Sequence, residues 1–299
     1  MIISDNWGEL LLPGLRSIFE KQTKKGKDYI PLLFNVENST KAQEFSLGTG
    51  ELGLMDEWEA SGGKISYEDF NKGFKSTYTH KKHSKGIQIE RELLDDDQYA
   101  TIKKRVRKLA TVGFNTTQHH AASVFNNATS GGYLGPDAKP LCATDHPISP
   151  SNSATWSNLG SYALDAENVE NTRTAMKTWT DDKGNPIDIN PDTIIVPTAL
   201  RKTAMIIAET AEEPFTTDHG INIWKGNLDV IEWHRLDDTN GWFIADMERM
   251  KLFLNWYWRR KLDFKDKVEF DDEVSKYAIL GRWSYGWDEP SFIYYNNPS

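Results

Sequence analysis

Residues 91–128 carry the pattern that constrains this chain most. Their apolar residues recur mostly three or four positions apart: Tyr99, Ile102, Val106, Leu109, Val112, Ala121, Val124 and Phe125. Such spacing places one apolar stripe along a helix, so it predicts a long amphipathic helix. Asp95, Asp96 and Asp97 stand near its start, where the helix dipole favours negative charge. About 30 helical residues would span roughly 45 Å, which is long for a globular domain.

Composition narrows the class of protein. The chain has 299 residues, 38% apolar and 26% charged, which suits one large or two smaller globular domains. A net charge of -9 argues against a general nucleic-acid-binding domain, which would be basic. One cysteine excludes an internal disulfide and a thiolate zinc cage. We find no signal peptide and no run of about 18–20 apolar residues, so we expect a soluble protein from a reducing cytoplasm, without membrane contact.

The segment before the long helix divides into two parts. Residues 1–35 hold a short apolar run and then KQTKKGKDY, which predicts an arm or a peripheral helix packed against another element. Residues 36–90 are rich in Gly and Lys. Near their end, FKSTYTH and GIQIERE read as two strands joined by the polar turn KKHSKG. Because an exposed, Lys-rich hairpin is marginal alone, we expect it to lean on a neighbour, another subunit being one option.

The segment after the long helix alternates between helix and strand patterns. Residues 129–163 are loop-like, and Asp165 is placed to cap a helix over DAENVENTRTAMKTW. A buried strand, DTIIVPTAL, and a second helix, LRKTAMIIAETAE, follow. The rest reads as strands: NIWKGNLDVIEWHRL, GWFIADMERMKLFLNWYWRR and several short strands to the end. The pattern predicts an α+β or mixed α/β protein with a separable middle lobe.

The stretch LCATDHP raises the question of catalysis, because it holds the only cysteine, Cys142, four residues before His146. A cysteine nucleophile needs a histidine base that Asn or Asp orients. No signature of a cysteine hydrolase surrounds Cys142. We therefore favour a small buried thiol and a turn residue before Pro147.

The other chemical patterns are weaker still. His119 and His120 would point about 100° apart on a helix, and His80 and His83 lie among lysines, which repel a cation. HExxH, CxxC and the Walker pattern are absent, and GTGELG at 48–53 reads as a flexible turn. We expect neither a metal nor another cofactor, and no enzyme activity.

Two surface features remain open at this point. The basic run Lys103, Lys104, Arg105, Arg107 and Lys108 is typical of a solvated helix face, or of a face toward a polyanion or another subunit. Trp256, Tyr257 and Trp258 are consecutive, so in a strand they face both sides and both must be covered. A partner chain could cover them as readily as a double-sided core.

Several runs in this order resemble the major capsid proteins of tailed bacteriophages, most closely the Mu-type major head subunit. They are PLCATDHP with its Ser/Asn loop, NVENTRTAMKTW with DDKGNPIDINPDTIIVPTAL, GNLDVIEWHRLDDTNGWFIAD, and GRWSYGWDEPSFIYY. The resemblance covers roughly residues 90–299, and residues 1–90 match by layout more than by motif.

The resemblance implies the HK-ninety-seven-type capsid fold, an α+β fold. Its parts would be an N-terminal arm (1–40), an extended loop or E-loop (41–92), a P-domain with the long spine helix (93–128 and 251–299) and an A-domain (129–250). Candidate contacts between subunits are Lys81, Lys82, Lys85, Trp256 and Trp258. Relatives crosslink Lys to Asn, but nothing in the sequence marks an activated lysine.

The resemblance also implies a function. The protein would form pentamers and hexamers in an icosahedral shell around double-stranded DNA, without sequence-specific binding, as part of the virion assembled in the host bacterial cytoplasm. Portal and decoration proteins would be separate partners. Scaffolding would be either a separate protein or absent, because no long charged helical prefix precedes the arm. The alternatives are an encapsulin-like nanocompartment shell and, from another class, a hydrolase using Cys142 and His146.

Overall fold

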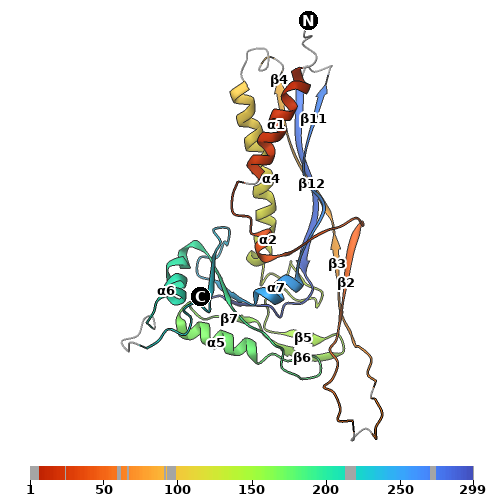
Figure 1. Ribbon diagram of the computed structural model, residues 1–299, viewed down its shortest axis with the longest axis vertical. Coiled ribbons are helices and arrows are strands. Elements are labelled where there is room, and N and C mark those ends of the chain that lie inside the picture. Colours follow the sequence, from red (N-terminus) through yellow and green to blue (C-terminus); the bar gives the residue numbers. More distant parts are fainter. Residues whose placement is uncertain are drawn as a thin grey trace.

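The computed structural model describes residues 7–23, 25–58, 62–65, 67–90, 92, 99–212, 220–269 and 274–298. Figure 1 shows a long column in which α4 runs beside β11 and β12, a lobe at one end of this column, and a strand pair, β2 and β3, whose connecting loop extends away from both. The predicted acidic start of the long helix, Asp95–Asp97, lies outside the described residues.

The column contains the long helix that the sequence predicts. Helix α4 spans Tyr99–Asn126, and α1 (Trp7–Thr23) packs against it, so the N-terminal segment is a helix covered by its own chain. Leu15 and Phe19 of α1 join a core with apolar residues of α4 and of the adjacent sheet, namely Ile102, Val106, Leu109, Phe264, Tyr277 and Ile279. Each such side chain contributes about 1.5–3 kcal/mol by leaving water.

A four-stranded sheet forms the other side of the column. Its order is β1 (Asn35–Asn38), β11 (Leu254–Glu269), β12 (Val274–Trp287) and β4 (Lys81–Glu90). β11 and β12 pair antiparallel along most of their length, and β1 pairs parallel with β11. The prediction of several short terminal strands was wrong for this pair. Register shifts between Trp258 and Asp263 interrupt the alternation of β11, and one long strand therefore reads as pieces.

The predicted hairpin between FKSTYTH and GIQIERE is also wrong. β3 (Lys72–Thr79) pairs with β2 (Gln43–Thr49), whereas β4 pairs with β12, so KKHSKG lies in a strand and not in a turn. The chain passes from one sheet to the other at His80. The buried His80 ring forms two hydrogen bonds: its Nδ1 lies 2.9 Å from Ser284 Oγ, and its Nε2 lies 3.0 Å from Ser39 Oγ. These hydrogen bonds hold the chain where it passes between the sheets, and no turn residue marks this position in the sequence.

The lobe is built on a five-stranded sheet with two helices. The strand order is β7 (Leu159–Gly160), β13 (Ile293–Asn296), β10 (Trp242–Ala245), β8 (Thr193–Val196) and β9 (Asp229–Glu232). Helix α5 (Ala166–Lys177) begins as predicted, since the Asp165 side chain accepts from the Asn168 amide, and α6 (Arg201–Glu209) follows the buried strand β8. Two short strands, β5 (His146–Ser149) and β6 (Asn152–Trp156), pair within the predicted loop.

One helix interrupts a predicted strand. Asp246 caps α7 (Met247–Phe253) by accepting from the Arg249 amide, directly between β10 and β11. A buried cluster then joins lobe and column, with α2 (Ile30–Leu33) packed beside it: Leu33, Phe34, Phe125, Trp233, Phe243, Trp256, Trp283 and Ile293. No described helix is long and apolar enough to cross a membrane.

Candidate assembly surfaces

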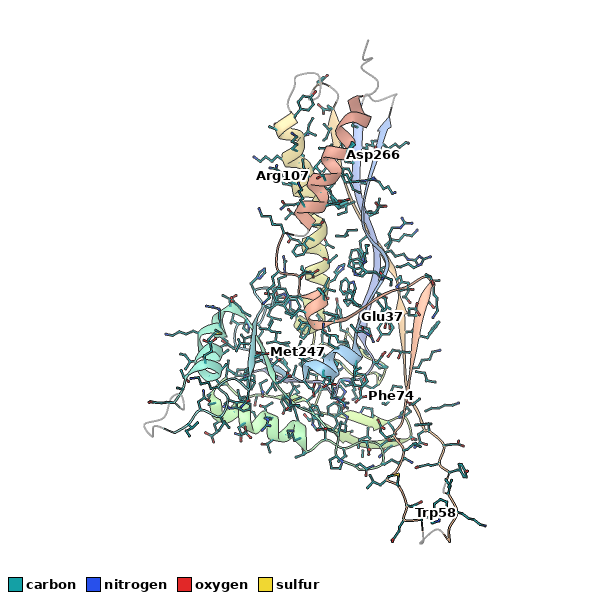
Figure 2. The ribbon with its side chains drawn as sticks, in the orientation of Figure 1. Glu37, Trp58, Phe74, Arg107, Met247 and Asp266 are labelled. Carbon is teal, nitrogen blue, oxygen red and sulfur yellow. The ribbon has the colours of Figure 1, made fainter. Side chains whose placement is uncertain are left out.

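Several exposed apolar side chains lie on the loop tip, which we define as residues 50–71 between β2 and β3. The described part of the loop tip has no regular helix or strand and extends beyond the lobe, with Trp58 near its end (Figures 1 and 2). Met55 is 100% exposed, Tyr67 90% and Leu54 82%. Further exposed apolar residues are Leu52, Trp58, Ile65 and Phe70 on the loop tip, and Phe45 and Leu47 on β2. So many exposed apolar side chains on one segment are typical of an interaction site.

Polar contacts with the lobe hold the base of the loop tip in place. Asp182 accepts from the Glu51 amide (3.0 Å) and from the Asn71 side chain (3.2 Å). Glu68 accepts from the Gly53 amide (2.8 Å) and pairs with Lys183, whose hydrogen bond lowers the pKa of Glu68. Charged groups thus fix where the loop tip starts, while its apolar residues stay outside.

Gly50 is required by the close approach at this base. A Cβ there would lie 2.6 Å from Asp182 Oδ2 and 3.0 Å from Asn71 Cβ, both shorter than ordinary contacts. A cleft of about 430 Å³ lies between the base and the lobe, and its walls include Trp156, Trp179 and Pro186. The base of the loop tip therefore contacts the lobe at its polar groups, with a cleft beside these contacts.

The three lysines predicted as subunit contacts lie exposed on β4, an edge strand of the column sheet. By register, Lys81 is opposite Trp283, Lys82 opposite Arg282 and Lys85 opposite Ile279, so Lys82 faces the other side of the sheet. Among the described residues, none of the three lysines forms an ion pair. Lysines on an edge strand also discourage unwanted strand pairing, so their position fits either role.

The two predicted tryptophan contacts differ from each other. Trp256 is 0% exposed, so its side chain cannot reach another subunit in this conformation. Trp258 is partly buried, with its ring centroid 5.5 Å from those of Trp256 and Trp283. On the opposite side of β11, Tyr257 lies 5.0 Å from Tyr78 of β3. The chain itself therefore covers both faces of this aromatic run, and only Trp258 retains surface for a partner.

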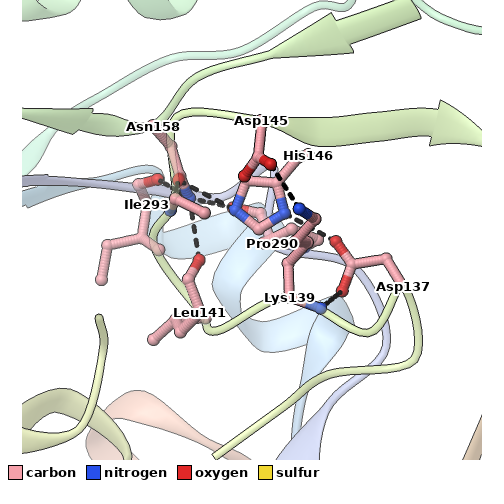
Figure 3. A network of polar contacts seen from close by, with 9 residues as sticks. Asp137, Lys139, Leu141, Asp145, His146, Asn158, Pro290 and Ile293 are labelled. Atoms are coloured by element: carbon pink, nitrogen blue, oxygen red, sulfur yellow. Dashed lines mark hydrogen bonds and ion pairs between the residues drawn. The ribbon is translucent and has the colours of Figure 1, made fainter. Parts of the chain in front are cut away.

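The LCATDHP stretch forms a buried polar network (Figure 3). His146 lies between Asp137 and Asn158, with Nδ1 2.6 Å from Asp137 Oδ2 and Nε2 3.0 Å from Asn158 Oδ1. The Asn158 side chain donates to the carbonyls of Leu141 (2.9 Å) and Ile293 (3.2 Å). The network thus ties the loop after α4 to the C-terminal strand β13.

Cys142 takes no part in chemistry in this geometry. Its side chain is 0% exposed, and burial raises the pKa of its thiol well above the usual value. A nucleophile must be a thiolate, so this environment works against catalysis. Both ring nitrogens of His146 are also engaged elsewhere. The site gives no support to the hydrolase alternative.

The structure brings together two histidines that the sequence keeps apart. The rings of His83 on β4 and His120 on α4 lie 4.7 Å apart, and His83 stacks on Trp283 at 4.1 Å. Trp283 Nε1 donates to His120 Nδ1 at 3.2 Å. Burial, reinforced by His83 and then by His119, lowers the pKa of His120 to about 4. Within the described residues, no three metal-binding side chains form a cation site.

Comparison with known proteins identifies the class. A family model described as phage capsid protein matches residues 74–296, which is most of the chain, so the chain belongs to the phage capsid protein family. No curated protein sequence matches it. Family and fold together confirm the function predicted from the sequence, that of a phage major capsid protein.

Solved structures show the same HK-ninety-seven-type fold at low identity. The procapsid of bacteriophage JBD30 superposes with a TM-score of 0.58 at 13% identity, covering 99% of this chain and 77% of that chain. A structure from Mycobacterium phage Adephagia gives a TM-score of 0.55 at 12% identity, covering 95% of this chain and 97% of that chain. A virus-like particle from Pyrococcus furiosus gives a TM-score of 0.56 at 10% identity, covering 95% of this chain and 98% of that chain. At these identities the likeness concerns the fold.

Proposed function

We propose that this phage capsid protein forms pentamers and hexamers that close into an icosahedral shell around double-stranded DNA. The observation that carries the proposal is the loop tip, where Leu54, Met55 and Tyr67 are more than four-fifths exposed in the single chain. Removing such side chains from water stabilises association by about 25 cal/mol per Å² of apolar surface before the costs of binding. A neighbouring copy that covers this surface supplies that gain at every subunit of a symmetric shell.

The division into capsid domains is part of this proposal. The N-terminal arm would comprise residues 1–40, the E-loop 41–92, the P-domain 93–128 and 251–299, and the A-domain 129–250. The column and the lobe support the last two parts over most of their length, since α4 and the β11–β12 pair lie together and the five-stranded sheet lies apart from them (Figure 1). The exceptions are β13, which belongs to the sheet of the lobe, and β4, which belongs to the sheet of the column.

The role we propose is structural and not catalytic. The shell would be assembled in the host bacterial cytoplasm, with scaffolding, portal and decoration proteins as separate chains, and would meet DNA without reading its sequence. Within the family we place the chain nearest the Mu-type major head subunit. The support is the order of its motifs, from PLCATDHP to GRWSYGWDEPSFIYY.

Negative-stain electron microscopy with light scattering tests the proposal. We expect closed shells or ring-shaped capsomers from the wild-type protein. The triple variant Leu54→Ser, Met55→Ser, Tyr67→Ser should remain folded but form no closed shells. Leu252→Ser, at a position 62% exposed on α7, is the control and should assemble normally. Normal shells from the triple variant would contradict the role given to the loop tip.

The structure dictates this choice of variants. A deletion of residues 64–90, the obvious test if they formed a free hairpin, would remove β3 and β4. It would delete the buried side chains Tyr78 and Ile89 and one edge of the column sheet. Loss of shells would then reflect a broken fold and would say nothing about assembly.

An encapsulin-like nanocompartment remains the second candidate, because the fold also matches the virus-like particle from Pyrococcus furiosus. The match of this chain to the phage capsid protein family favours the phage head. Mass spectrometry of the contents of shells from native cells distinguishes the phage head from the nanocompartment. Packaged DNA supports the phage head, and a co-purifying enzyme cargo without DNA would support the nanocompartment.

A further inference from the structure

The first half of α4 carries five cationic side chains that the fold leaves exposed. They are Lys103, Lys104, Arg105, Arg107 and Lys108, and we call them the α4 basic face. Residues 99–126 contain no acidic residue. In the described part of the chain, none of the five has an acidic side chain within ion-pair distance. Lysines and arginines clustered along one helix form the kind of electrostatic surface that contacts nucleic acid.

Helix geometry places four of these charges on one side. Ile102, Val106 and Leu109 are buried against α1 and the column sheet. At about 100° per residue, Lys103, Lys104, Arg107 and Lys108 fall within an arc of about 140° opposite this buried stripe, and Arg105 lies beside the stripe. Figure 2 labels Arg107 in this half of α4, which stands apart from the lobe. From Lys103 to Lys108 the helix rises by about 7.5 Å, so the charges form a compact patch.

Two other basic side chains of the column have partners. On the far face of the sheet, Lys265 pairs with Asp263 at 3.0 Å, and Arg282 Nε donates to the His80 carbonyl at 3.2 Å. The lobe segment 129–250 carries nineteen acidic and nine basic residues. The net charge of -9 therefore includes an acidic surplus on the lobe, while the described part of the column carries cations without ion pairs on α4 and, at Lys81, Lys82 and Lys85, on β4.

We propose that the α4 basic face contacts the phosphates of the enclosed double-stranded DNA and so marks the side of the column that faces the shell interior. This inference rests on the proposed function. Duplex DNA presents one negative charge per about 1.7 Å of its axis, a density that a patch of several cations matches without reading bases.

A neighbouring subunit's loop tip is the rival occupant, since it carries Asp56 and Glu57. It fits less well, because its most exposed side chains, such as Met55 and Tyr67, are apolar and need apolar cover. Positions 103–108 offer only cations on the exposed arc. DNA phosphates require charge alone, so they match this surface better.

Fluorescence anisotropy with a labelled duplex of about 30 base pairs tests the proposal on the full-length protein. The variant Lys103→Gln, Lys104→Gln, Lys108→Gln is compared with Lys82→Gln, Arg260→Gln, Lys265→Gln, which removes the same charge from β4 and β11. Each lost phosphate contact lowers the slope of log K against log salt by about 0.9. We expect the α4 variant to lose about 2 to 3 units of slope and at least about tenfold in affinity at low salt, with less than about twofold change in the control.

Two results would overturn the inference. Equal losses in both variants, or none in the α4 variant, would show that the α4 basic face is not a DNA contact. Shell formation that is lost in Lys103→Glu, Lys104→Glu and restored by adding Asp56→Lys, Glu57→Lys would assign the face to a neighbour's loop tip. Failure of the wild-type protein to form any shell would instead count against the proposed function, which the binding data do not measure.

Discussion

The loop tip and helix α4 distribute their apolar and charged side chains in opposite ways. On α4, apolar side chains such as Val106 are buried within the chain and the cations remain outside. On the loop tip, apolar side chains such as Met55 remain outside, while its base contacts Asp182 and Lys183 of the lobe through polar and charged groups. The difference shows which surfaces the single chain completes alone. In the column, the apolar side chains are buried within the chain and the charged ones lie outside. On the loop tip, the apolar side chains are exposed, and only another molecule could bury them.

The largest expected effect separates a core tryptophan from an assembly contact. Trp256→Ala should lower the free energy of unfolding by about 3–5 kcal/mol, because it leaves a large cavity in the core shared by lobe and column. Urea unfolding of the unassembled protein measures this. Leu252→Ala, on the exposed surface of α7, should stay within about 0.5 kcal/mol. If the Trp256→Ala protein had normal stability but failed to assemble, Trp256 would be a subunit contact and not a core residue.

The next effect concerns the buried network that joins the column to the lobe. Asp137→Ala leaves the ring of His146, which is 0% exposed, without one of its two hydrogen-bond partners and should cost about 1–3 kcal/mol. Asp145, which pairs with Lys139 at the surface, is the matched control, and Asp145→Ala should leave the urea midpoint unchanged. Equal behaviour of the two variants would show that the Asp137–His146 contact contributes nothing beyond a surface pair.

A smaller, local effect is expected at the base of the loop tip. Asp182→Ala removes the acceptor for the Glu51 amide and the Asn71 side chain, so local opening becomes easier by about 1 kcal/mol. Hydrogen exchange at Glu51 should then become roughly fivefold faster with the global stability unchanged. Glu57→Ala, within the loop tip, serves as the control. No change in exchange would mean that the loop tip is positioned by its own backbone.

A pH-dependent effect is expected where α4 meets β4. Folding lowers the pKa of His120 from 6.5 to about 4, so the unfolded chain binds its proton more tightly. Its contribution to stability is therefore constant above pH 6.5 and falls as the pH drops toward 4. The urea midpoint of the wild-type protein should decrease more between about pH 7 and pH 5 than that of His120→Gln. Identical pH profiles would exclude His120 as the cause.

Sequence patterns correctly predicted the elements that depend on interactions between residues close together in the chain. The spacing of apolar residues by three and four predicted α4, the capping residue Asp165 predicted the start of α5, and an apolar run predicted the buried strand β8. The order of motifs from residue 90 onward led to the family. Asp246 carried a capping signal for α7 as well, but the apolar run on both sides of it favoured a strand. The apolar residues of the loop tip form only short alternating runs between glycine turns, such as Leu52 with Leu54, so the sequence offered no reason to single them out.

By itself, the sequence determined the elements whose residues interact within a turn or two of the chain, the absence of a disulfide, and the basic charge on α4. Only the tertiary structure decided which strands pair, because pairing depends on groups far apart in the chain. His80 meets Ser284, His83 meets His120, and β4 adds to β12 and not to β3. The same long-range packing buried Trp256 and left Met55 exposed, since burial depends on which other parts of the chain cover a residue and not on the residue type alone.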